Sequence, residues 1–124
     1  TGVDTLTGDG GANKINGNNG ADIITGGAGN DNLTGGNGDD TFVYAAGAGA
    51  DTINDFDAAA AGGQDLIDIS AFGINAGNFA TRVAIIDVGP DTVIRIDDSV
   101  FITLKGVSGN ADNVITEADF IFGP

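Results

Sequence analysis

The sequence predicts an all-β protein, in which a flattened right-handed spiral of parallel strands is followed by a region of ordinary antiparallel strands. Residues 8–43 form four consecutive nine-residue units with one shared pattern of glycine, aspartate or asparagine, and apolar residues. Repeats of fixed period indicate an architecture that is stacked coil by coil. From residue 65 onward, β-branched segments alternate with turn residues instead, which is typical of conventional strands and hairpins.

Each nine-residue unit combines a glycine-rich turn with one very short strand. The units are GDGGANKIN, GNNGADIIT, GGAGNDNLT and GGNGDDTFV. Their glycines permit the positive φ angles and sharp reversals that other residues resist. Two units make one coil, so we expect the strands to stack in parallel in two sheets. The apolar residues of one sheet are Leu6, Ile24 and Phe42, and those of the other are Ile15 and Leu33.

An aspartate or asparagine lies two residues before each of these apolar positions. One apolar side chain in each unit does not offset the entropy lost when so many glycines are ordered, so something besides burial must hold the turns. Calcium takes about six to eight oxygens, from carboxylates and backbone carbonyls alike. Ordinary turn preference explains a single such motif equally well, but five units in phase favour a metal. The pairs that would share an ion are Asp4 with Asp22, Asn13 with Asp31, and Asp22 with Asp40.

In this pattern the chain resembles the RTX (repeats-in-toxin, haemolysin-type) calcium-binding β-roll, whose nonapeptide is G-G-x-G-x-D-x-U-x. Residues 26–34 and 35–43 match it in full, whereas residues 17–25 have Asn18 at the second glycine. Residues 8–16 have Asp9 at that glycine and Asn13 at the ligand aspartate, so the ion that Asn13 shares is expected to be weak or absent.

The resemblance implies a parallel β-roll over residues 1–57, followed by a C-terminal antiparallel β capping region over residues 58–124. It also implies that one turn gives the carbonyls of its first and third motif positions, that the partner turn gives those of its second and fourth, and that each gives its aspartate. The predicted ligands of calcium (Ca2+) are Asp4, Gly8, Asp9, Gly10, Gly11, Asn13, Gly17, Asn18, Asn19, Gly20, Asp22, Gly26, Gly27, Ala28, Gly29, Asp31, Gly36, Gly38, Asp40 and Asp51.

Residues 47–53 resemble a degenerate unit displaced by two residues, with Asp51 and Ile53 in the motif positions. Asp51 either completes an ion site with Asp31 or belongs to an ordinary acidic turn before a strand. From the pairing we expect about two to three ions in the roll, with one more if Asp51 takes part.

Acidic residues dominate the chain, with 18 carboxylates, 4 basic residues, no histidine and a net charge of −14. This charge argues against nucleic acid or an anionic membrane as a partner, and no apolar stretch is long enough for membrane insertion. Bound cations would relieve the self-repulsion, although solubility alone also explains the acidity. The first residues, TGVDTLTG, already follow the repeat register, which indicates a fragment of a longer polypeptide.

The C-terminal half is expected to cover the exposed edge of the roll. Residues 58–64 are predicted as a connector, residues 65–70 as a strand and residues 70–73 as a helical turn closed by glycine. Further strands are predicted over residues 80–87, 91–97 and 100–106, the last two antiparallel. Residues 116–119 are expected to form a helical turn before the apolar end at residues 120–122. The resemblance assigns this end to a type I secretion signal, and an ordinary core strand is the alternative.

No enzyme is visible in the sequence. Without histidine or cysteine there is no nucleophile–imidazole pair, and Asp97 with Asp98 are better explained as a turn than as a glycosidase pair. The single Tyr44 is expected to be structural.

Two functions follow. The preferred one is a secreted, extracellular calcium-binding module that folds when calcium binds and supports type I secretion and stability of an attached protein, with the type I secretion machinery as a partner. The alternative is a polysaccharide-binding or adhesin module similar to the accessory modules of alginate epimerases. It requires clustering of the basic residues Lys14, Arg82, Arg95 and Lys105, with Arg95 and Lys105 together on the predicted hairpin; solvated strand faces are the other explanation of these residues.

Overall fold

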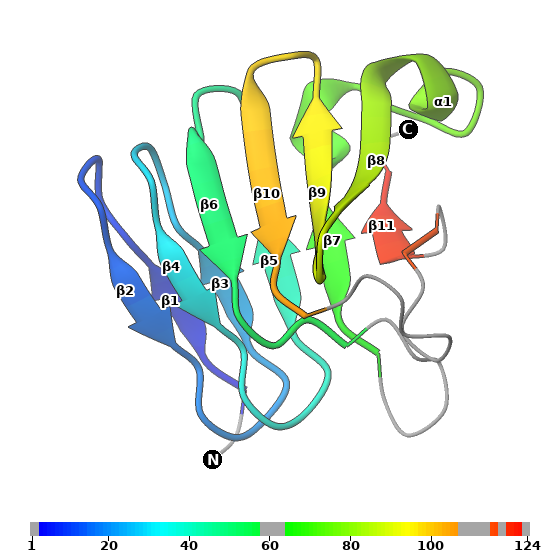
Figure 1. Cartoon of the computed structure of the whole chain (residues 1–124). Coiled ribbons are helices and arrows are strands. Elements are labelled where there is room, and N and C mark those ends of the chain that lie inside the picture. The colour runs from blue at the N-terminus through cyan, green and yellow to red at the C-terminus, as the bar shows by residue number, and fades with distance from the viewer. Residues whose placement is uncertain (1–2, 58–63, 107–114, 117–118, 123–124) are drawn as a thin grey trace.

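The computed structural model describes residues 3–57, 64–106, 115–116 and 119–122, and it consists mainly of two β-sheets (Figure 1). The first five strands are β1 (Thr5–Thr7), β2 (Lys14–Asn16), β3 (Ile23–Thr25), β4 (Asn32–Thr34) and β5 (Thr41–Val43). They alternate between the sheets and pair in parallel, β1 with β3, β3 with β5, and β2 with β4. Ile24 lies opposite Leu6 and Phe42, and Leu33 lies opposite Ile15. The predicted two-sheet arrangement is confirmed.

The spiral continues beyond the regular repeats. Strand β6 (Ala50–Ile53) pairs in parallel with β4, placing Ile53 opposite Leu33. Strand β7 (Leu66–Asp68) pairs in parallel with β5, placing Ile67 opposite Phe42. The displaced unit at residues 47–53 therefore forms part of a coil, as predicted.

The last four strands complete both sheets. They are β8 (Val83–Val88), β9 (Asp91–Ile96), β10 (Val100–Leu104) and β11 (Phe120–Ile121). Strands β8, β9 and β10 pair antiparallel in sequence order, which confirms the predicted antiparallel region. Strand β10 also pairs in parallel with β6, and β11 pairs in parallel with β7. Figure 1 shows β6, β10, β9 and β8 side by side, so the sheets of the roll continue directly into the capping region.

Two short helical turns flank the cap. The predicted turn at residues 70–73 is confirmed as a 3₁₀ helix, η1 (Ser70–Phe72), which ends at Gly73 with φ of 70°. The strand predicted over residues 80–87 begins only at Val83, because Phe79–Arg82 form the helix α1. The backbone N–H of Arg82 and the hydroxyl of Thr81 both donate to the carbonyl of Asn78, which holds this turn. Residues 58–63 of the predicted connector and residues 117–118 of the predicted helical turn lie outside the described residues.

The core thickens from the first coil toward the cap. Leu6 and Ile15 are only partly buried, whereas Ile24, Leu33 and Phe42 are almost completely buried. At the far end Phe79 packs edge-on against Phe120 and Phe122, with ring centroids 5.0 and 5.5 Å apart. No helix within the described part of the chain is long and apolar enough to cross a membrane. The first coils thus have the least hydrophobic support in the fold.

Candidate metal centre

The residues two positions before the inward apolar residue of each short strand form two ladders. One consists of Asp4, Asp22, Asp40 and Asp65, and the other of Asn13, Asp31 and Asp51. Each carboxylate uses Oδ1 to accept the backbone N–H of the preceding rung. In the first ladder these distances are 2.9 Å for Asp22 with Asp4, 3.0 Å for Asp40 with Asp22, and 2.9 Å for Asp65 with Asp40. In the second they are 2.8 Å for Asp31 with Asn13 and 2.9 Å for Asp51 with Asp31. The structure thus brings together every predicted pair, including Asp31 with Asp51.

The second carboxylate oxygen is what makes these ladders a candidate metal centre. The Oδ2 atoms of Asp22, Asp31, Asp40 and Asp51 are buried and have no hydrogen-bond partner among the described residues. Their side chains are at most 3% exposed. A buried carboxylate oxygen without a partner is costly, and such a group in a native fold calls for an explanation such as an ion. A hard divalent cation that prefers oxygen ligands satisfies this donor set, so the residues fit calcium.

The first glycine of each unit makes room for this oxygen. A Cβ added to Gly17, Gly26 or Gly35 would lie 2.4, 2.4 or 2.2 Å from Oδ2 of the aspartate five residues later. Such contacts are far shorter than van der Waals distance, so any side chain would displace the carboxylate. At Gly8 the corresponding neighbour is Oδ1 of Asn13, at 2.5 Å. Glycine at the first motif position is therefore required by the aspartate of its own unit.

The second and fourth motif positions bring backbone carbonyls against the next coil. These positions have positive φ at Asn18, Gly20, Gly27, Gly29, Gly36 and Gly38. A Cβ on Gly36 would lie 1.8 Å from the carbonyl oxygen of Asn18, and one on Gly38 would lie 2.3 Å from that of Gly20. The Asn18 carbonyl also accepts the N–H of Asn37 at 2.8 Å, which leaves it a second lone pair. The third-position residues Gly10, Asn19 and Ala28 are exposed, and the role of all these carbonyls as ligands stays a prediction.

In the outermost turn, the side chains of Asp9 and Asn13 find hydrogen-bond partners within the turn itself, without an ion. Oδ1 of Asp9 accepts the N–H of Gly11 at 2.8 Å and the amide of Asn13 at 3.1 Å, and Asn13 Oδ1 accepts the N–H of Asp9 at 2.9 Å. The hydrogen bond from Gly11, followed by that from Asn13, holds the pKa of Asp9 below its usual value. This arrangement agrees with the expectation that the Asn13 site is the weakest.

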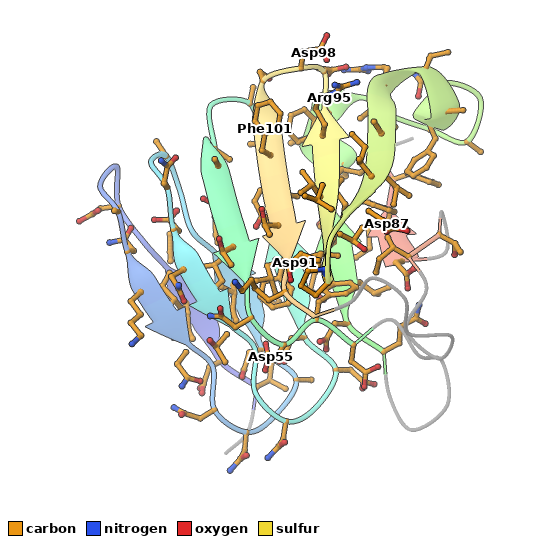
Figure 2. The ribbon with its side chains drawn as sticks, viewed as in Figure 1. Asp55, Asp87, Asp91, Arg95, Asp98 and Phe101 are labelled. Carbon is orange, nitrogen blue, oxygen red and sulfur yellow. The ribbon has the colours of Figure 1, made fainter. Side chains whose placement is uncertain are left out.

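Four residues with roles at the ladders were missed from the sequence. Gly47 and Gly49 have φ of 89° and 82° and take the second and fourth positions of the last unit. Asp65 is a further rung, but its Oδ2 accepts the N–H of Asp57 at 2.9 Å, so neither of its oxygens is left over. Asp55, which Figure 2 labels in the turn that follows β6, accepts the N–H groups of Gly35 and Gly36 at 2.9 and 2.7 Å. A usable signal existed for Asp65, because it lies two residues before the apolar Ile67.

Burial and mutual repulsion make the ladders unfavourable places for negative charge. Burial, opposed by the backbone hydrogen bonds and reinforced by the neighbouring carboxylate, raises the pKa of Asp40 and of Asp51 to about 6. Burial likewise raises the pKa of Asp65 to about 7. No three acidic side chains within the described ranges converge on one point. An ion in a ladder would therefore rest on two carboxylates and complete its shell with backbone carbonyls.

The basic residues do not form the cluster that the polysaccharide-binding alternative requires. Arg95 lies opposite Phe101 within the β9–β10 pair, whereas Lys105 follows the other end of β10, so the two are separated along the hairpin. Figure 2 shows Arg95 near Asp98 at one end of the hairpin and Asp91 at the other. Arg95 forms an ion pair with Asp98 at 3.0 Å, and Lys105 with Asp91 at 4.0 Å.

Arg82 lies with Arg95 instead, in a polar depression that also includes Asp97 and Asp98. Arg82 Nε donates to Oδ1 of Asp97 at 2.9 Å, and this contact lowers the pKa of Asp97. Asp97 and Asp98 have positive φ, 50° and 60°, in the tight turn that joins β9 and β10. Their interpretation as turn residues is confirmed.

Comparison with known proteins identifies the repeats. The sequence signature described as "RTX calcium-binding nonapeptide repeat (4 copies)" matches residues 1–33 and 17–53. No curated protein sequence matches the chain.

Solved structures match nearly the whole chain. The AlgE6R3 subunit of a mannuronan C5-epimerase from Azotobacter vinelandii is 27% identical with a TM-score of 0.61, over 97% of this chain and 78% of that one. The AlgE6R2 subunit is 25% identical with a TM-score of 0.61, over 94% of this chain and 91% of that one. The extracellular lipase LipA from Serratia marcescens is 22% identical with a TM-score of 0.64, over 96% of this chain but 21% of the lipase, and this likeness concerns the fold alone.

Proposed function

Because residues 1–53 form an RTX calcium-binding β-roll, we propose that this chain is a calcium-triggered folding module of a larger secreted protein. The roll folds when calcium binds outside the cell. The folded module stabilises the attached protein, and its unfolded state inside the cell favours export by type I secretion machinery. The module itself carries no catalysis.

The observation that carries this proposal is the set of buried Oδ2 atoms without partners in Asp22, Asp31, Asp40 and Asp51. Without cations these carboxylates repel one another in a chain of net charge −14, and the coils around them bury few apolar residues. When cations are bound, their attraction to the carboxylates offsets the free-energy cost of burying these charges. Because the sites exist only when the coils are stacked, the free energy of ion binding becomes free energy of folding.

The residues that would hold the ions are the neighbouring rungs of each ladder. On the first ladder these are Asp4 with Asp22 and Asp22 with Asp40, and on the second Asn13 with Asp31 and Asp31 with Asp51. The Asn13 pair is the weakest, because the Oδ1 atom of this neutral amide already accepts the N–H of Asp9. Calcium supplies positive charge and a flexible oxygen shell at such sites, while the chain fixes their spacing through strand pairing.

Extracellular location is supported by the expected affinity and by the relatives. Extracellular calcium modules bind in the range of about 10⁻⁴–10⁻³ M, so such sites stay empty at cytosolic calcium and fill outside. The lipase with the same fold is extracellular by its description. The apolar end predicted as an export signal also has a structural role, since Phe120–Ile121 form β11 beside β7.

Calcium titration of chelated protein tests the proposal. We expect the chain to be expanded in chelator and to become compact with β-type circular dichroism as calcium reaches the millimolar range. Magnesium at equal concentration is the matched control, because it demands a smaller and more rigid shell. A chain that is equally compact and equally stable in chelator and in calcium would contradict the proposal.

A second function, binding of an anionic polysaccharide, is favoured by one observation. The likeness to the mannuronan C5-epimerase subunits spans almost the whole chain, and the depression around Arg82 and Arg95 offers two guanidinium groups. Both already pair with carboxylates, which a polymer would have to displace. Calorimetry with alginate oligomers in calcium tests this function, with Arg95→Ala as the variant and Lys105→Ala as its control. Absence of heat would exclude it without affecting the first proposal.

A further inference from the structure

The last coil departs from the other units at the first motif position. In register with Gly26 stands Ala46, which is exposed and forms part of a turn closed by the N–H of Ala48 and the carbonyl of Ala45. The preceding residue Tyr44, directly after β5, is 2% exposed. The displaced unit is therefore preceded by a buried tyrosine, and an alanine stands at its first motif position where the other units have glycine.

The hydroxyl of Tyr44 has no hydrogen-bond partner of good geometry among the described residues. The ring packs in the core, and a phenylalanine would fill that space without burying a hydroxyl. Because an unpaired buried hydroxyl costs free energy, its presence needs an explanation. Phe42 and Phe56, which pack against each other in the same core, show that aromatic packing there does not require a polar atom.

The charged groups that act on this hydroxyl are the rungs of the second ladder, Asp51 and Asp31. Burial raises the pKa of Tyr44, and the carboxylates of Asp51 and, more weakly, Asp31 raise it further. Oδ1 of Asp51 is held by the N–H of Asp31 at 2.9 Å. Oδ2 of Asp51 and Oδ2 of Asp31 are buried without partners. Three buried oxygens, from the residue after β5, from β6 and from the residue before β4, thus have unused lone pairs.

We infer that the hydroxyl of Tyr44 is part of a cation site between Asp31 and Asp51, and that the ring of Tyr44 reports whether this site is filled. The inference rests on the proposed calcium binding and adds a residue that the nonapeptide pattern does not contain. A phenol both donates and accepts. Its neutral oxygen is also a suitable hard ligand for a divalent ion.

The composition makes the site directly observable. The chain has one tyrosine and no tryptophan, so tyrosine emission comes from Tyr44 alone. Terbium, which occupies calcium sites and luminesces when a nearby tyrosine is excited, serves as the probe. We expect terbium luminescence that calcium displaces, and a change in Tyr44 emission at the same calcium concentrations. Asp51→Asn, which keeps an oxygen for the Asp31 N–H, should abolish the luminescence. Asp39→Asn, at an exposed residue outside the ladders, makes the same change in net charge and should leave it intact.

Tyr44→Phe tests the hydroxyl itself, with calorimetry in place of the lost fluorophore. We expect the affinity at one calcium site to fall by about tenfold, since one neutral oxygen ligand of the ion is removed, while the other sites and the circular dichroism in excess calcium stay unchanged. Tyr44→Phe with wild-type ion number and affinities would overturn the inference, as would terbium luminescence that survives Asp51→Asn. If neither the wild type nor any variant binds calcium, the proposed function itself is wrong.

Discussion

The backbone N–H of Asp22 donates to Oδ1 of Asp40 at 3.0 Å, while Oδ2 of both carboxylates is buried without a partner. One oxygen of each aspartate thus fixes the register of the next coil, and the other is left for a cation. Coil alignment and ion binding therefore depend on the same aspartates. Loss of the ion weakens the stacking of the coils, and loss of the stacking removes the ion site.

Asp22 is the rung at which this coupling is strongest, because it belongs to two shared sites. In Asp22→Asn the Oδ1 acceptor for the Asp4 N–H is kept but the charge is removed. We expect both sites to weaken and the calcium midpoint of folding to rise by at least about tenfold. Asp39→Asn, an exposed neighbour outside the ladders, makes the same change in net charge. Equal calorimetric titrations of the two variants would contradict the assignment.

Glycine at the first motif position is a steric requirement that can be tested with two alanines. Gly35→Ala would place a Cβ 2.2 Å from Oδ2 of Asp40. We expect a loss of about 2–3 kcal/mol in unfolding free energy in calcium, the range of severe overpacking. A Cβ at Gly10 has nothing within 4 Å, so Gly10→Ala should change stability by less than about 0.5 kcal/mol. Urea unfolding at fixed calcium measures both, and a tolerated Gly35→Ala would show that the carboxylate is not fixed there.

The repeat pattern of the sequence was sufficient to predict the first coils, because each of them is determined by residues close together in the sequence. Glycine turns, ligand aspartates and single apolar residues recur at fixed spacing, so β1 to β5 and their sheet assignments follow from the pattern. Asp65 escaped because it lies 25 residues from Asp40, whereas Asp40 lies 18 from Asp22. A longer connection hides the same aspartate–apolar interval from a search at constant period.

Long-range pairing set the rest of the fold. Strand β10 lies beside β6, and β11 beside β7. The local sequence of β10 or β11 does not predict which strand it pairs with. Helix α1 replaced the predicted start of β8 because Asn78 accepts hydrogen bonds from both Arg82 and Thr81. Likewise, the alternative function required Arg95 and Lys105 to cluster on their shared hairpin, but the β9–β10 register places them apart.

Protons should compete with calcium at the ladders. The pKa values of Asp40 and Asp51 are about 6, above the ordinary 3.8, because burial disfavours their charge. Protonation therefore stabilises the ion-free roll fully at pH below 3.8, and this contribution is lost as the pH rises through about 6. The calcium-bound roll needs the same carboxylates ionised. We expect the calcium midpoint to be about tenfold higher at about pH 5.5 than at about pH 7.5. Titrations with identical midpoints would show that the buried carboxylates are not the ligands.

The cap should contribute stability that calcium does not replace. Phe120 is 6% exposed and packs edge-on against Phe79, and its strand β11 completes the sheet beside β7. Phe120→Ala removes this ring from the core, so we expect a loss of about 3–5 kcal/mol even at saturating calcium. Phe101 is 38% exposed on β10 (Figure 2), and Phe101→Ala should cost less than about 1 kcal/mol. Thermal unfolding in excess calcium compares the two. If added calcium restores the stability of Phe120→Ala to that of the wild type, the ladders alone hold the fold and the cap is dispensable.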